Sequence, residues 1–125
     1  MARTAMIVDD STTMRNMVSI ALKEASFEVC AASDGDDALN LLSDERDLDV
    51  IITDINMPNM NGIELIKALR AKTKYKFTPI LVLTTEGGED MKMKGKQAGA
   101  TGWIVKPFNP DTLLAAVNKV CGISG

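Results

Sequence analysis

Asp49-Val50-Ile51-Ile52-Thr53-Asp54-Ile55-Asn56-Met57-Pro58 is the stretch that decides the fold expected for this chain. Val50, Ile51 and Ile52 form an uninterrupted β-branched run, which is typical of a strand buried on both faces of a parallel sheet. The strand ends at a carboxylate, Asp54, and the turn-forming residues after it bend the chain sharply. Asp54 is therefore expected at the carboxyl edge of a central parallel strand, where open α/β sheets bind ligands.

Strand and helix patterns alternate on both sides of this stretch. Strands are predicted over residues 4–8, 27–32, 50–53, 79–84 and 101–105. Helices are predicted from Ser11 or Thr12, after Asp34-Gly35, over about residues 62–70, over 86–98, and from Asn109-Pro110. With right-handed crossovers, five such units predict an α/β fold: a doubly wound, flavodoxin-like parallel sheet with helices on both faces and strand order 2-1-3-4-5.

Composition narrows the class of protein. A chain of 125 residues with 46% hydrophobic residues is expected to form one domain over residues 1–125. A formal charge of −3 argues against nucleic acid as a partner. The absence of histidine excludes histidine zinc sites, catalytic triads and a phosphohistidine carrier. Cys30 and Cys121 have no metal-ligand spacing, and neither a signal peptide nor a membrane-spanning run is evident, so a cytoplasmic location is expected.

Acidic residues follow two strands that this order makes neighbours. Strands one and three lie about 4.8 Å apart in such a sheet, so Asp9, Asp10 and Asp54 are expected to converge. Three carboxylates this close repel one another, and a cation among them relieves the repulsion. Because the donors are hard oxygens without nearby histidine or cysteine, the expected ion is Mg²⁺.

The fourth and fifth strands bring a hydroxyl group and a cation to the same edge. Thr84 ends the fourth strand and Lys106 follows the fifth. Together with the acidic cluster, these groups suit phosphoryl transfer to a carboxylate, with Mg²⁺ and Lys106 neutralising charge and Thr84 donating to the transferred oxygens. These physical arguments do not distinguish Asp54 from Asp10 as the nucleophile.

Each of these residues also has a simpler explanation. Asp9 and Asp10 could be a charge pair at a helix N-terminus, which the helix dipole favours. Thr84 and Thr85 could cap the following helix, and Lys106 could be an ordinary surface lysine. Taken singly these explanations are the better ones, but all of them holding at one sheet edge is much less probable.

The strand ends carry Asp9-Asp10 (first strand), Asp54 (third), Thr84 (fourth) and Lys106-Pro107 (fifth). Together these residues resemble the receiver domain of two-component response regulators, over essentially the whole chain. The segments 9–15 and 54–62 resemble the stand-alone chemotaxis subgroup, the CheY type. The resemblance implies that Asp54 is the phosphoacceptor of a histidine kinase. It also implies Mg²⁺ ligation by Asp10, Asp54 and the Asn56 carbonyl oxygen, with Asp9 acting through water, and a cis Lys106–Pro107 bond.

The resemblance further implies an output surface on the fourth helix, fifth strand and fifth helix. Its switch residues would be Thr85, Pro107 and Trp103, which stands where the family usually has Tyr or Phe. Because indole is larger and its N–H needs a partner, Trp103 is expected to swing inward incompletely or to stay outside as a binding anchor, unless it is a plain core residue. The implied partners are a kinase, a flagellar motor switch protein and a phosphatase, with no membrane or nucleic acid.

Other functions remain as alternatives. A stand-alone receiver could instead act in a phosphorelay or as a phosphate sink. A phosphatase of the haloacid-dehalogenase kind also uses aspartate and Mg²⁺, but it needs Asp-x-Asp where this chain has adjacent Asp9 and Asp10. A flavodoxin-like cofactor carrier would place a phosphate against the same two carboxylates, which repel it. The sequence therefore favours a signalling switch that assists only its own phosphorylation and dephosphorylation, not an enzyme.

Overall fold

Five strands and five α-helices alternate through residues 3–122, the part of the chain that this computed structural model describes. In chain order they are β1 (Arg3–Val8), α1 (Thr12–Glu24), β2 (Phe27–Ala32), α2 (Gly35–Leu41), β3 (Val50–Thr53), α3 (Gly62–Arg70), β4 (Ile80–Thr84), α4 (Glu89–Ala98), β5 (Gly102–Val105) and α5 (Pro110–Cys121). All the strands pair in parallel in the order β2-β1-β3-β4-β5. The predicted fold class and strand order are confirmed.

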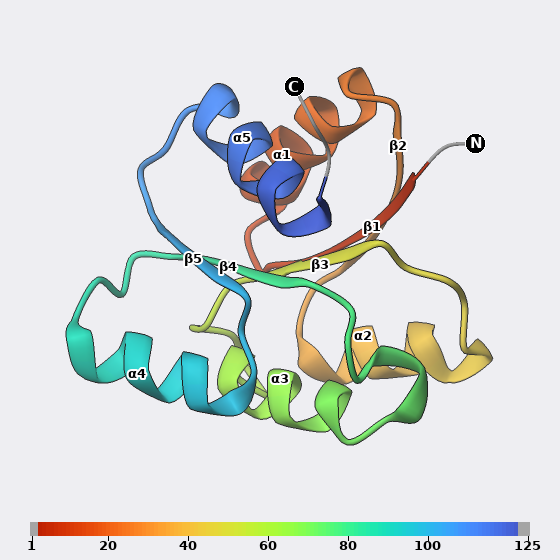
Figure 1. The fold of residues 1–125 in the computed structure, drawn as a ribbon, viewed down its shortest axis with the longest axis vertical. Coiled ribbons are helices and arrows are strands. Elements are labelled where there is room, and N and C mark those ends of the chain that lie inside the picture. Colours follow the sequence, from red (N-terminus) through yellow and green to blue (C-terminus); the bar gives the residue numbers. More distant parts are fainter. Residues whose placement is uncertain (1–2, 123–125) are drawn as a thin grey trace.

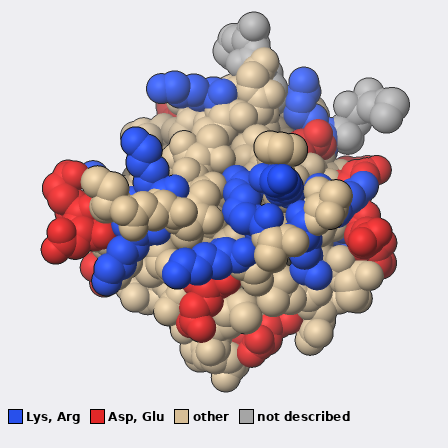
Figure 2. All heavy atoms as spheres, turned by 60° about the horizontal axis from the view of Figure 1, so that its bottom comes forward, with Lys and Arg blue, Asp and Glu red and all other residues tan. Residues whose placement is uncertain are grey.

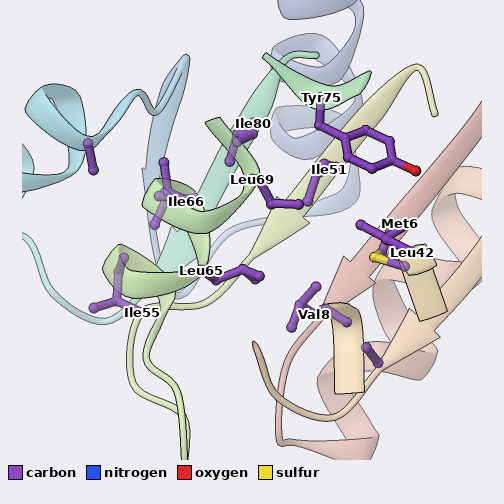
Figure 3. Close-up of a cluster of buried hydrophobic side chains, with 14 residues drawn as sticks. Met6, Val8, Leu42, Ile51, Ile55, Leu65, Ile66, Leu69, Tyr75 and Ile80 are labelled. Atoms are coloured by element: carbon purple, nitrogen blue, oxygen red, sulfur yellow. The ribbon is translucent and has the colours of Figure 1, made fainter. Parts of the chain in front are cut away.

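Helices cover both faces of the sheet, and each face has its own hydrophobic cluster. In Figure 1, α1 and α5 lie on one face, and α2, α3 and α4 lie on the other. Successive residues of a strand point to opposite faces, so Ala5 and Ile7 of β1 pack with α1 and α5 while Met6 and Val8 pack on the other side. Figure 3 shows the cluster that contains Met6 and Val8, in which the buried Tyr75 ring lies among aliphatic side chains.

Helix α4 begins later than predicted. The sequence pattern placed its start at Glu86, but the helix begins at Glu89, with Gly88 as an N-cap that has no side-chain hydrogen bond. Gly87 and Gly88 offer no capping oxygen and pay a high entropic cost in a helix, so residues 85–88 form a loop instead. At the other end, Gly99 terminates α4 with φ 117°, as predicted.

Arg70 ties the end of α3 to the end of α4. Its guanidinium donates to the carbonyl oxygens of Tyr75 (2.8 Å) and Thr78 (2.6 Å) in the loop before β4. The same group donates to the Gly99 carbonyl oxygen at 2.8 and 3.1 Å. Burial lowers the pKa of this guanidinium from its usual value. The C-terminal end of α4 is thereby fixed to the body of the fold.

Candidate functional site

The ends of β1 and β3 bring the three aspartates together. Val8 and Thr53 are register partners in the parallel pair, so the next residues, Asp9 and Asp54, leave the sheet side by side. The Asp54 N–H donates to the Val8 carbonyl oxygen at 3.0 Å, which continues the ladder by one residue. One carboxylate oxygen from each of Asp9, Asp10 and Asp54 lies within 4.8 Å of the others. The convergence expected from the strand order is present.

Lys106 supplies a cation to this cluster. Its ammonium group lies 3.0 Å from Asp9 Oδ2 and 3.4 Å from Asp54 Oδ2, and its side chain is only 13% exposed. The Lys106 N–H donates to the Thr84 carbonyl oxygen, and the Lys106–Pro107 bond is cis, as the resemblance implied. Lys106 is therefore not an ordinary surface lysine. Asp9 does lie at the start of α1, where it accepts from the Ser11 N–H at 2.9 Å, but it is also buried and paired with Lys106.

The carboxylate of Asp54 is held from both sides. Its Oδ1 atom accepts hydrogen bonds from the backbone N–H groups of Ile55 (2.7 Å) and Asn56 (3.4 Å), while Oδ2 faces Lys106. Gly62 packs directly beneath, since a Cβ atom there would lie 2.2 Å from the Asp54 carbonyl oxygen. Gly62 lies within the segment 54–62 that carries the resemblance, but its close approach to the Asp54 backbone was not predicted from the sequence.

The loop after β3 is attached to α2 as well. The Asn59 side chain donates to Asp34 Oδ2 at 2.8 Å, and Asp34 caps α2 by accepting from the Asp37 N–H. The Asp37 N–H and then Asn59 lower the pKa of Asp34 below its usual value. Asn59 itself has φ 67°, a left-handed conformation that asparagine tolerates better than most residues. The turn carrying Asn56 is therefore held at two points, by the hydrogen bond from the Asn56 N–H to Asp54 and by the one from Asn59 to Asp34.

Thr84 ends β4 and is fully buried, whereas Thr85 is exposed. The hydroxyl oxygen of Thr84 accepts from the Glu86 N–H at 3.3 Å. Neither threonine is the N-cap of α4, because that position belongs to Gly88. The capping explanation of Thr84 and Thr85 is therefore wrong.

Glu86 is the contributor that the sequence pattern missed. Its side chain accepts from the Asn56 amide at 3.3 Å, and its carbonyl oxygen accepts from Trp103 Nε1 at 2.9 Å. Trp103 is half-buried against the cluster under α2, α3 and α4, so it does not stand outside the fold. Pro107 is exposed beside Lys106. No local pattern marks Glu86, because its contacts depend on how the loop 85–88 folds.

The donor set fits a hard divalent cation. Asp9 and Asp54 are largely buried, while Asp10 is exposed and opens the cluster to solvent. Mg²⁺ is commonly bound by one or two carboxylates and keeps several of its waters, which such a half-open cluster allows. Asp9, Asp10 and Asp54 are thus suited to holding Mg²⁺, with its charge added to that of Lys106.

Comparisons with known proteins agree with this geometry. The family model of the response regulator receiver domain matches residues 5–118, and the chain belongs to this family. A chemotaxis protein CheY homolog of Campylobacter jejuni is 42% identical over 118 residues, covering 94% of this chain and 91% of the relative. Chemotaxis protein CheY1 of Helicobacter pylori is 41% identical, covering 94% and 95%.

Solved structures give the same result. The crystal structure of Vibrio cholerae chemotaxis protein CheY4 matches with a TM-score of 0.91 and 50% identity, covering 96% of this chain and 99% of that one. A response regulator structure from Chloroflexus aurantiacus matches with a TM-score of 0.91 and 34% identity, covering 98% and 99%. The chain is thus a receiver domain of the CheY type, a class that acts in chemotaxis two-component signalling.

Among residues 3–122, no helix is long and apolar enough to cross a membrane.

Proposed function

We propose that this protein is a phosphorylation-dependent switch in which Asp54 accepts a phosphoryl group from a histidine kinase. The observation that carries the proposal is the Lys106 ammonium group, which bridges Asp9 and Asp54 inside a cluster of three carboxylates. Such a cluster is costly without cations, and it suits a reaction that places further negative charge on Asp54.

In the proposed reaction, an Asp54 oxygen attacks the phosphorus of a phosphohistidine. The new O–P bond forms as the P–N bond breaks, and the imidazole leaves with the electron pair and takes up a proton from water. Lys106 neutralises charge on the transferred oxygens, and the Thr84 hydroxyl turns from the Glu86 N–H to donate to them. Asp10, Asp54 and the Asn56 carbonyl oxygen would hold Mg²⁺, with Asp9 acting through water, and the ion would supply further charge neutralisation. Hydrolysis of the acyl phosphate resets the switch.

The output would be a change in partner binding on the surface of α4, β5 and α5, with Thr85, Trp103 and Pro107 near its centre. The chemotaxis names of the relatives support a flagellar motor switch protein as the proposed target. A phosphatase is proposed as a second partner from the family resemblance alone. On this proposal the chain acts in the cytoplasm as one domain over residues 1–125. It promotes only its own phosphorylation and dephosphorylation.

The test is titration with Mg²⁺ and then acetyl phosphate, with the same samples followed by mass spectrometry and Trp103 fluorescence. We expect a gain of one phosphoryl group that requires Mg²⁺ and is absent from Asp54→Asn. A fluorescence change that accompanies the mass gain would connect Trp103 to the switch. If the wild type gains no mass, or if Asp54→Asn gains as much, the proposed function is wrong.

A further inference from the structure

Trp103 lies in a slot that only glycine permits on the facing helix. Its indole packs against Gly95, in the interior of α4. A Cβ atom at Gly95 would lie 2.4 Å from Cζ3 of the indole, closer than real contacts allow, and 3.0 Å from Cε3, which is tighter than most real contacts. Glycine inside a helix destabilises it relative to alanine, so this position sacrifices helix stability where the indole needs space.

The polar edge of the same indole is also held. Trp103 Nε1 donates to the Glu86 carbonyl oxygen at 2.9 Å, and Glu86 accepts from Asn56 through its side chain. Indole is a rigid group with only two side-chain torsions, so an atom placed at its Cζ3 edge would displace the whole ring. That displacement would break the hydrogen bond to Glu86 and release the loop 85–88 from β5.

The slot forms part of the surface expected to carry the output. Trp103 lies in the wall of a groove of about 340 Å³. The groove is lined by Lys92, Lys96, Ala100, Thr101, Gly102 and Trp103. Lys92 and Lys96 are one helical turn apart on α4, on the same side as the indole. The position of Trp103 therefore helps to shape this groove.

On the basis of the phosphorylation and output surface proposed above, we propose that Gly95 is a positioning residue for Trp103. It keeps the indole between α4 and β5 both before and after phosphorylation. The signal then reaches the groove through movement of the loop 85–88 and α4 together with the ring, and no rotation of the ring to the outside takes part.

The first test is a double-mutant cycle on unphosphorylated protein. Gly95→Ala should lower Tm in the wild type, although alanine favours helix. In Trp103→Ala, where the slot is empty, the same change should raise Tm by about 4 °C. Gly88→Ala, at the N-cap of α4, is the control for a methyl group that meets no side chain, and its effect on Tm should be the same in both backgrounds, because nothing lies within 4 Å of a Cβ there. A Gly95→Ala effect of the same sign in both backgrounds would overturn the proposal, and failure of Gly95→Ala to fold while the double variant folds would support it.

The second test is acrylamide quenching of Trp103 fluorescence, with phosphorylation counted by mass spectrometry. Acrylamide is neutral, so the nearby lysines do not attract it. We expect the quenching constant of the wild type to change by less than about twofold on phosphorylation, and folded Gly95→Ala to be quenched at least about twofold more. A larger change in phosphorylated wild type would overturn the proposal. Absence of any mass gain would overturn the proposed function instead. The double-mutant cycle would still test whether Gly95 positions Trp103, because it uses unphosphorylated protein.

Discussion

At the scale of single residues, Lys106 places one ammonium group between two buried carboxylates. Its contacts with Asp9 and Asp54 are 3.0 and 3.4 Å long, and all three side chains are at most 13% exposed. Lys106→Met would leave those carboxylates without a cation, and we expect the free energy of unfolding in EDTA to fall by about 1–3 kcal/mol. Urea unfolding measures this, with the exposed Lys94→Met as control.

Added Mg²⁺ should reduce the difference in free energy of unfolding between wild type and Lys106→Met, because the ion supplies the missing positive charge. Equal stability of wild type and variant in EDTA would show that Lys106 does not balance this cluster.

Gly62 lies against the backbone of Asp54 and leaves no room for a side chain. Since the atom that a Cβ would meet at 2.2 Å is a backbone oxygen, Gly62→Ala must displace the Asp54 peptide. Misplacing a reacting group lowers rates steeply, so we expect phosphorylation by acetyl phosphate to slow by at least about tenfold. The rate of mass gain measures this, with circular dichroism to confirm folding and Gly88→Ala as control. An unchanged rate would mean that the turn adjusts without moving Asp54.

The acidic cluster and Lys106 were predictable because Asp9, Asp54 and Lys106 directly follow strands, and Asp10 is next to Asp9. Parallel strand ends share one edge, so strand order alone brings Asp9, Asp54 and Lys106 together. Glu86 and Gly62 were not predictable in this way. Their contacts depend on the shapes of the loops before α3 and α4, which have no periodic pattern in the sequence.

At the scale of elements, helix starts were predicted well where a side chain caps them. Ser11 and Asn109 each accept a hydrogen bond from the first turn of their helix, as expected. The predicted start of α4 at Glu86 was wrong because Gly87 and Gly88 have no side chain that could mark a helix cap. The connection over residues 73–78 contains two lysines and two threonines, yet Tyr75 in it is fully buried and donates to the Arg46 carbonyl oxygen.

Tyr75 makes stability depend on pH in the alkaline range. Burial raises the pKa of its phenol, so the folded state retains this proton after the unfolded state has begun to lose it. The stabilisation is present below the unfolded pKa of about 10 and is lost as pH rises through the folded pKa. We expect wild type to exceed Tyr75→Phe by about 1 kcal/mol near pH 8, from the lost hydrogen bond, and this advantage to shrink near pH 11.

Guanidinium unfolding of both proteins at these two pH values measures the difference. Tyr75 is the single tyrosine of the chain, so absorbance also reports its ionisation directly. An advantage that grows with pH would contradict the assignment.

At the scale of the whole molecule, one sheet is shared by both hydrophobic clusters, so unfolding is expected to be cooperative. Mg²⁺ that binds only the folded acidic cluster should then stabilise the entire fold, by about 2.7 kcal/mol at a concentration near one hundred times Kd. Thermal melts followed by Trp103 fluorescence and by far-ultraviolet circular dichroism should shift together. Asp10→Asn should reduce the shift, and an equal shift with sodium chloride of matched ionic strength would exclude specific binding.

Charge is distributed unevenly over the molecule. Residues 67–96 carry eight Lys and Arg against three Asp and Glu, although the whole chain has a net charge of −3. Figure 2 looks toward the face covered by α2, α3 and α4, and shows Lys and Arg across its middle with Asp and Glu toward its margins. This face therefore favours approach by acidic partners, while the net charge keeps the molecule as a whole acidic.

The hydrogen bonds from Arg70 to Gly99 fix the C-terminal end of α4, while its N-terminal end has no such attachment among the described residues. The helix has ten residues and is about 15 Å long, with an uncapped start beside Glu86 and an end held at Gly99. A shift of the loop 85–88 should therefore tilt α4 about Gly99 and change the angle of its lysines more than the position of its last turn. We expect amide hydrogen exchange to be fastest in the first turn of α4 and to slow toward Gly99, a gradient that Arg70→Met should flatten.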